Sequence, residues 1–147
     1  MSSLDVQKLR EETGAGIMDC KRALEEAKGD YNLAKEIIFK KGIAKAEKKA
    51  DRAMGAGVLE TYIHNGRVGV LLELRCETDF VGRSEPVKEL AKNLALQIAS
   101  MAPENVEDLL KQPYVKDPNI TVENLLKNTI AKVGENMKIE RFARYQI

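Results

Sequence analysis

The chain has 147 residues, 44% of them hydrophobic and 32% charged, which is the composition of a water-soluble folded protein. Its 24 basic and 23 acidic residues leave a net charge of only +1, which argues against electrostatic attraction to nucleic acid or anionic lipid. The longest apolar runs are far shorter than a membrane span, and the N-terminal stretch carries acids and lacks the apolar core of a signal peptide. We therefore expect a cytoplasmic protein without membrane contact or direct nucleic-acid contact.

Residues 1–42 predict three short helices joined by brief connections. Ser3 is expected to cap the first helix and Asp30 the third, because such side chains accept hydrogen bonds from the unpaired N–H groups at a helix start. The glycines expected to begin or end these helices are Gly14, Gly16, Gly29 and Gly42. The apolar positions suffice only for a thin shared core, so we interpret this region as a compact orthogonal three-helix module.

Residues 43–54, "IAKAEKKADRAM", favour a helix but offer mostly alanine for an apolar face. A helix with so little to bury would be exposed and only weakly held. We interpret this stretch as a charged helical linker that lets the module move relative to the C-terminal part of the chain.

Residues 55–147 predict an α+β core. Two apolar stretches flank Asn65-Gly66, a pair typical of the type I′ turn of a β-hairpin. From Val68 to Cys76 apolar residues alternate with others, as in a half-buried antiparallel strand. The terminal stretch "MKIERFARY" predicts a further strand whose alternation breaks at Arg141, which indicates a bulge or an edge position.

Two amphipathic helices are predicted between these strands, capped by Ser84 and Thr121. The first stripe comprises Val87, Leu90, Ala91, Leu94, Ala95 and Ile98, and the second comprises Val122, Leu125, Leu126, Thr129, Ile130 and Val133. Between them, a short helical stretch around Leu109 leads into "PYVKDP", which we interpret as a turn-rich connection. The resulting order, β-β-α-α-β, predicts a small antiparallel sheet packed with helices.

The sequence offers few residues for catalysis. His64 has no partner at metal-ligand spacing and is expected to be a surface turn residue. The "GAG" at 14–16 lacks the preceding strand and the Gly-Lys-Ser/Thr of a phosphate loop. Cys20 and Cys76 are expected to be buried, reduced thiols. We expect neither an enzyme nor a cofactor or metal site, which leaves binding as the function.

Three features suit binding. Ile17 is expected to join the buried stripe of its helix, whereas Met18 lies about 100° further round, with Lys21 one turn on. Met18 is either an exposed contact or a filler at the core edge. Phe80, beside Asp79, either presents its ring to a partner or folds back under the next helix. The arginines of "RFARY" either bind a partner or line the solvated face of an edge strand.

Three blocks of the chain resemble the bacterial elongation factor Ts family. They are "LREETGAGIMDCKRALEEAKGDYNLAKE" at 9–36, "LELRCETDFVGRSE" at 72–85 and "AKVGENMKIERFARY" at 131–145. Together they are spread along nearly the whole chain, from residue 9 to residue 145. The strings "TGAGIMDCKRAL" and "CETDFV" are long and unusual, so chance is a poor explanation for the match.

The resemblance implies guanine nucleotide exchange on the translational GTPase elongation factor Tu. In the family, the acid and aromatic of the "TDFV" loop enter the GTPase domain near its Mg²⁺ site, which assigns those roles to Asp79 and Phe80, flanked by Thr78 and Val81. This favours the interpretation of Phe80 as a wedge.

The resemblance further implies a module of the ubiquitin-associated type, which contacts the same GTPase domain through residues matching Ile17, Met18 and Lys21. It also implies a core that serves in dimerisation, and we expect a homodimer through the core sheet. Many members carry a long helical segment after the helix ending near Met101, where this chain has only "APENVEDLLK". The alternative function is that of a protein-binding adaptor without exchange activity.

Overall fold

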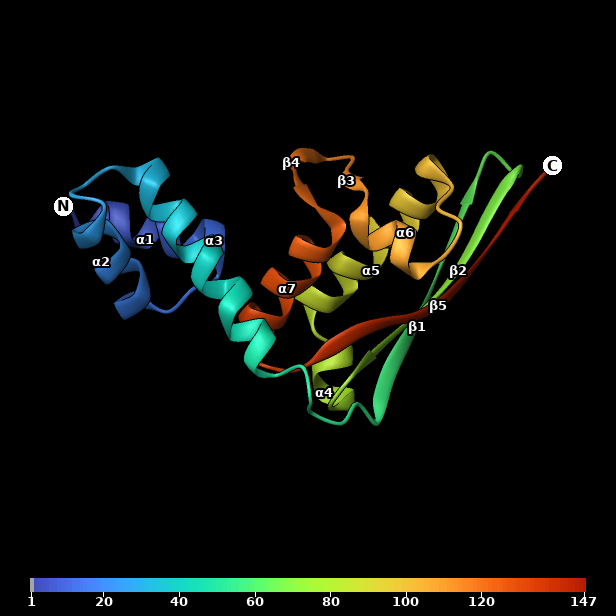
Figure 1. The fold of residues 1–147 in the computed structure, drawn as a ribbon, viewed down its shortest axis with the longest axis horizontal. Helices are drawn as coiled ribbons and strands as arrows, with labels where there is room; N and C mark the ends of the chain where they lie inside the picture. Colours follow the sequence, from blue (N-terminus) through green and yellow to red (C-terminus); the bar gives the residue numbers. More distant parts are fainter. Residues whose placement is uncertain (1) are drawn as a thin grey trace.

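The computed structural model describes residues 2–147, and its N-terminal part is a bundle of three helices (Figure 1). They are α1 (Ser3–Thr13), α2 (Ile17–Glu26) and α3 (Tyr31–Lys48). The residues buried among them are Leu9, Cys20, Ala23, Leu24, Ala27 and Ala34. Because three of these six are alanines, the module has the thin core that the sequence predicted.

The side-chain caps of α1 and α3 follow the expected chemistry, with one correction at α1. Ser2, not Ser3, caps α1, and its hydroxyl accepts a hydrogen bond from the backbone N–H three residues on, at 3.1 Å. Asp30 caps α3 in the same way, also at 3.1 Å. Gly14 ends α1 with a φ of 73°, a backbone conformation that glycine adopts without a steric penalty. The prediction for Ser3 was wrong because that residue already belongs to the first turn.

The third helix does not end at Gly42. It continues to Lys48 and lies along the later helix α7 (Val122–Val133), as Figure 1 shows. A Cβ added at Gly42 would lie 2.9 Å from Asn128 Oδ1, so the glycine permits this close approach. Ala46, at 3% exposure, belongs to the main core. The expectation of an exposed, weakly held linker is therefore wrong for this part of α3, because small residues let two helices pack closely.

The main sheet has three antiparallel strands in the order β1-β2-β5. These are β1 (Ala56–His64), β2 (Val68–Cys76) and β5 (Met137–Gln146). Asn65 and Gly66 join the first two with φ values of 52° and 65°, which confirms the type I′ turn. The register of β2 against β5 shifts by one residue where Glu73 faces Arg141, which confirms the bulge, and β5 is an edge strand.

Helices cover one face of this sheet (Figure 1). The long helix α5 (Glu85–Met101) buries the whole predicted stripe from Val87 to Ile98. Ser84 stands at its N-cap position, but its hydroxyl donates to the Val81 carbonyl at 2.6 Å instead of accepting from the helix. Thr121 caps α7 as predicted, accepting from the backbone N–H three residues on at 3.1 Å.

The connection between α5 and α7 contains more regular structure than the sequence predicted. The helix α6 (Val106–Lys111) was expected, but the strands β3 (Pro113–Tyr114) and β4 (Asp117–Thr121) were interpreted as turn. The two strands pair with each other, and the backbone of this hairpin is hydrogen-bonded to the side chain of Gln97 of α5, which is fully buried. Its side-chain amide donates to the Pro113 carbonyl at 3.1 Å and accepts from the Val115 N–H at 2.9 Å. A buried amide must be paired, and the hairpin supplies the groups.

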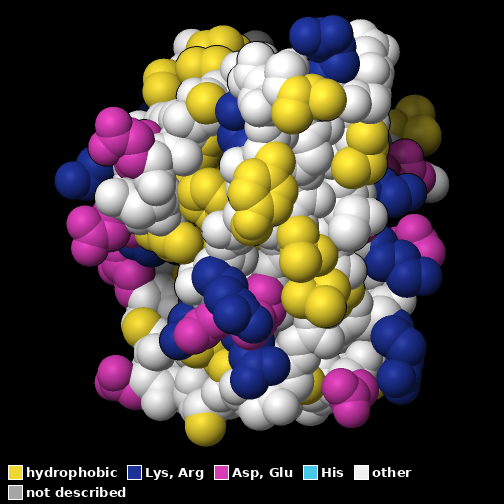
Figure 2. Space-filling model, turned by 90° about the vertical axis from the view of Figure 1, so that its right-hand side faces the viewer, with side chains coloured by type: hydrophobic (Ala, Val, Ile, Leu, Met, Phe, Trp, Pro, Cys, Tyr) yellow, Lys and Arg dark blue, Asp and Glu magenta, His cyan; other side chains and the backbone are white. Residues whose placement is uncertain are grey.

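The other face of the main sheet is uncovered. Figure 2 views it from the right of Figure 1 and shows apolar side chains gathered above a group of charged ones. The exposed apolar residues of the strands are Leu59, Ile63, Leu71 and Tyr145, and we call this surface the open sheet face. Glu73 and Arg141 form an ion pair on it at 2.9 Å. The helices of residues 2–147 include none long and apolar enough to cross a bilayer.

Candidate partner-binding surfaces

The first candidate surface is the four-residue helix α4 (Asp79–Gly82), which directly follows β2. Thr78 caps it, and its hydroxyl accepts a hydrogen bond from the Val81 N–H at 3.3 Å. Phe80 is 81% exposed, so the alternative in which its ring folds back under the next helix is wrong. The ring stands in solvent at the second position of the helix.

The neighbours of Phe80 differ in how accessible they are. Thr78 and Asp79 are exposed, and within residues 2–147 the Asp79 carboxylate makes no side-chain hydrogen bond or ion pair. Val81, in contrast, is only 8% exposed and belongs to the main core. Of the four predicted loop residues, Val81 therefore anchors α4 to the protein and is not available as a contact.

A residue far along the chain fixes the start of α4. Both carboxylate oxygens of Glu135 accept hydrogen bonds from Thr78, one from its backbone N–H at 3.0 Å and one from its hydroxyl at 2.7 Å. Sequence reasoning missed Glu135, because nothing in the local pattern links positions 57 residues apart. The pairing arises because the ends of β2 and β5 are neighbours, with Cys76 facing Met137.

Cys76, the last residue of β2, also helps to hold the start of α4. Burial raises the pKa of its thiol, and its Sγ donates to the Thr78 carbonyl at 3.2 Å. A Cβ added at Gly82 would lie 3.4 Å from that sulfur, so the helix packs tightly on the thiol. Burial also raises the pKa of Cys20, and both cysteines are unpaired and buried, as predicted.

The second candidate surface is the start of α2. Met18 is 55% exposed, which excludes the interpretation of a core-edge filler. Ile17 is 53% exposed, so its assignment to the buried stripe is wrong; the stripe consists of Cys20, Ala23 and Leu24. At the first helical position, Ile17 precedes the turn that packs against α1 and α3. Lys21 is exposed one turn further on, and it borders with Ile17 a shallow groove between α1 and α2.

The structure does not bring the two surfaces together. Figure 1 shows α2 in the module at one end of the molecule and α4 at the base of the sheet, with α3 connecting the two parts. A single large partner could contact both surfaces, whereas a small ligand could not. The arrangement favours recognition of another macromolecule.

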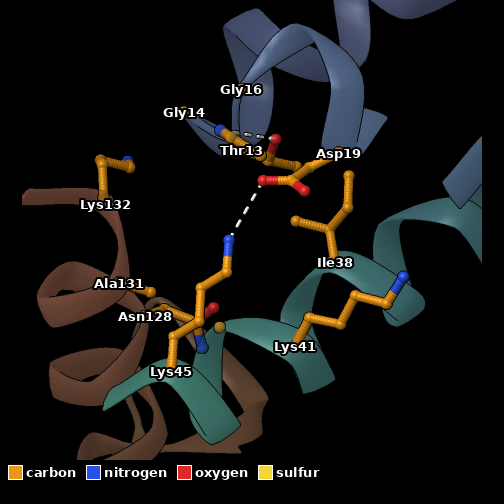
Figure 3. Close-up of a pocket in the computed structure, with 12 residues that line it drawn as sticks. Thr13, Gly14, Gly16, Asp19, Ile38, Lys41, Lys45, Asn128, Ala131 and Lys132 are labelled. Atoms are coloured by element: carbon orange, nitrogen blue, oxygen red, sulfur yellow. Dashed lines mark hydrogen bonds and ion pairs between the residues drawn. The ribbon is translucent and has the colours of Figure 1, made fainter. Parts of the chain in front are cut away.

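A cavity of about 180 Å³ lies where the module meets the core (Figure 3). Asp19 reaches across it to Lys45 of α3, with 3.1 Å between Oδ2 and Nζ. A Cβ at Gly14 would lie 2.6 Å from Cε of Lys132, so the lysine stem packs on the bare glycine. The Lys132 contact joins the module to α7, whereas the Asp19–Lys45 ion pair links α2 to the C-terminal part of α3. The "GAG" glycines serve as helix ends, as predicted.

The structure contains no clear metal-binding group in the part that it describes. Residues 2–147 include no cluster of three or more histidine, cysteine, aspartate or glutamate side chains placed to hold an ion. His64 is exposed beside the hairpin turn and pairs with the Tyr62 hydroxyl at 2.9 Å. Arg144 of "RFARY" donates to the Ile98 and Ala99 carbonyls and so closes the end of α5, which gives this arginine a structural use.

Comparison with known proteins gives the family. The model of the family described as "Elongation factor TS" matches residues 33–108 and 77–147. The chain belongs to the elongation factor Ts family. An elongation factor Ts from a Nostoc species is 50% identical over 143 residues, 97% of this chain. Those from Carboxydothermus hydrogenoformans and Thermotoga maritima are 42% and 43% identical over 193 and 186 aligned positions.

The relatives differ from this chain in length. The chain spans 45% of the Nostoc protein, but 89% of the Carboxydothermus and 94% of the Thermotoga proteins. The Carboxydothermus alignment has 193 positions against 147 residues, so that elongation factor Ts contains residues without a counterpart here. Membership of the family supports a role in translation elongation.

Proposed function

We propose that this chain is a guanine nucleotide exchange factor that binds elongation factor Tu with bound GDP and promotes GDP release in the cytoplasm. The observation that carries the proposal is Phe80, an aromatic ring 81% exposed on a helix fixed at its start by hydrogen bonds. Burying an apolar ring that its own fold leaves in water is favourable, so a partner that covers this ring gains binding free energy. The family to which the chain belongs supports the identity of that partner.

The energetic task follows from linkage. A GTPase that holds nucleotide with nanomolar affinity has about 12 kcal/mol of binding free energy. An exchange factor accelerates release when it binds the nucleotide-free form of the GTPase more tightly than the nucleotide-bound form. The coupling is reciprocal: the factor weakens nucleotide binding by the same free energy by which the nucleotide weakens binding of the factor. A surface that bound both forms equally would shift nothing. The factor therefore needs contacts that exist only when the nucleotide site is distorted.

We assign this differential contact to α4. The Phe80 ring would enter the GTPase domain near its Mg²⁺ site only when that site has opened, and the exposed Asp79 carboxylate would hold the altered backbone there. Thr78 and Val81 keep the helix in place from behind. Ile17, Met18 and Lys21 would bind a second, remote surface, whose binding energy offsets the distortion.

The decisive experiment measures release of fluorescent GDP from purified elongation factor Tu with and without this chain. We expect the release rate to rise with concentration of the chain to a plateau. A pull-down with and without excess GDP separates the adaptor alternative, since an exchange factor must lose affinity as GDP is added. Binding that ignores GDP, together with an unchanged release rate, would refute the proposal.

The open sheet face supports a second part of the proposal, association of two copies. Its apolar residues belong to all three strands, and a second sheet stacked at about 10 Å would bury them. Glu73 and Arg141 lie on the same face, so the acid of each copy can pair with the arginine of the other. Sedimentation equilibrium at micromolar concentration tests this: a single species of monomer mass would contradict it.

A further inference from the structure

The turn between α7 and β5, residues 134–136, touches both parts of the proposed machinery. Glu135 accepts two hydrogen bonds from Thr78. The next backbone N–H, that of Asn136, donates to Oε2 of Glu77 at 2.8 Å. The ends of the two strands are thus joined by reciprocal hydrogen bonds. Glu135 accepts from the residue that caps α4 after β2, and Glu77 accepts from the residue that precedes β5. Charge-assisted hydrogen bonds of this kind are about twice as strong as neutral ones.

The same turn also holds the end of α3. Asn136 is only 4% exposed, and its side-chain amide donates to the carbonyls of Ala50 and Arg52 at 3.2 and 2.9 Å. The Arg52 guanidinium returns to the turn, donating to the Gly134 carbonyl at 3.4 Å and pairing with Glu77 at 3.6 Å. Residues 50–52 directly follow the helix that carries the module, so one short turn binds both the exit of α3 and the cap of α4.

This geometry matters because α4 cannot hold its own orientation. A helix of four residues lies far below the length at which helix formation is self-sustaining, so its direction depends on the buried Val81 side chain and on what binds its ends. Glu135 supplies the fixed point at the N-terminal end. The module is held on the core mainly by the packing of α3 on α7, and Asn136 adds a second fixed point at the exit of α3.

We propose that Glu135 and Asn136 are positioning residues for nucleotide exchange. Glu135 keeps α4 in the orientation that presents Phe80, and Asn136 keeps the module at a fixed spacing from α4, so that one partner contacts both surfaces at once. This inference rests on the proposed function. Neither side chain needs to touch the partner for this role.

The two roles affect different quantities. A loosened α4 still docks through the module, but its ring spends less time in the productive orientation, so the maximal exchange rate falls. A loosened spacing lowers the effective concentration of one surface once the other has bound, so overall affinity falls.

The test of Glu135 compares Glu135→Ala with Glu135→Gln in GDP release from elongation factor Tu. We expect the alanine variant to lower the plateau rate by about fivefold and to change the half-saturating concentration by less than about twofold. The glutamine variant should recover most of the rate, because an amide oxygen still accepts the Thr78 N–H. The matched control is Asp108→Ala, which removes a carboxylate that accepts one backbone N–H far along the chain from α4, at 3.0 Å.

The test of Asn136 uses non-additivity. Asn136→Ala should raise the half-saturating concentration several-fold when the module surface is intact. In a background where Ile17 and Met18 are both alanine, the same change should raise the half-saturating concentration by a much smaller factor, because the spacing between the surfaces no longer matters once one surface is lost. A purely structural role would give the same cost in both backgrounds, and thermal unfolding of each variant reports its stability separately.

The outcomes separate the two proposals. If the unaltered chain does not accelerate GDP release, the proposed function fails. If it does, two results would overturn a positioning role while the proposed function stands. One is a full plateau rate in Glu135→Ala, and the other is an equal rise in half-saturating concentration for Asn136→Ala in both backgrounds.

Discussion

The two candidate surfaces present an apolar side chain at the same place in a helix but hold it by different means. Met18 and Phe80 are each the second residue of their helices, and both are more than half exposed. The ten-residue α2 starts at Gly16 without a side-chain cap, because its own buried stripe holds it. The four-residue α4 buries a single large side chain, that of Val81, and its start is held by hydrogen bonds with Thr78 and Glu135.

The difference shows how helix length decides which residues matter. A helix with three buried side chains keeps its first turn in place through packing alone, so its cap is dispensable. A single turn with one buried side chain also needs hydrogen bonds from outside itself, and here they come from Glu135, in a distant part of the chain. For this reason the two surfaces should respond differently to substitution.

The largest effect is expected from Phe80→Ala. Removing the ring should slow GDP release from elongation factor Tu by well over tenfold, because the contact made only with the opened nucleotide site is lost. The free energy of unfolding should change by less than about 0.5 kcal/mol, since the ring buries little in its own fold. Met101→Ala, another exposed apolar residue, is the control. Exchange at the unaltered rate would remove Phe80 from the mechanism.

Met18→Ala should have a smaller effect of a different kind. We expect the half-saturating concentration to rise by roughly three- to tenfold, with a plateau rate close to that of the unaltered chain, because the module supplies affinity remote from the nucleotide. Titration of release rate against concentration of the variant separates the two parameters. A lost plateau rate with unchanged affinity would reverse the roles assigned to the two surfaces.

The smallest effect is expected from Gly16→Ser, which adds the cap that α2 lacks. The backbone there, with φ −65° and ψ 156°, suits any residue, and the added Cβ would lie 3.8 Å from the nearest atom, Asp19 Oδ2. We expect a gain of a few tenths of a kcal/mol in the free energy of unfolding, measured by urea denaturation. Gly14→Ser is the contrasting variant, and it should lose about 1 kcal/mol or more, because Gly14 has a φ of 73° and carries the stem of Lys132. A loss of stability in Gly16→Ser would show that α2 does not tolerate a capped start.

Much of the fold was predictable because its signals are local. The Asn65-Gly66 turn, the stripe of α5 and the caps at Asp30 and Thr121 each depend on residues within one or two turns of chain. The exposure of Phe80 was not predictable from its neighbours, since the pattern suited a buried ring equally well. The family resemblance, carried by the strings around it, favoured an exposed ring, and the ring is exposed.

The failures share a physical cause. The continuation of α3 past Gly42, the β3–β4 hairpin around Gln97 and the grip of Glu135 on Thr78 all arise between residues far apart in sequence. The sequence by itself determined most of the helices, the β1–β2 hairpin and the family, because backbone preference and hydrophobic period act over a few residues. Only the tertiary structure decided how the module packs on the core and how α4 is oriented. Both depend on which side chains, distant in sequence, the packed sheet and helices bring into contact.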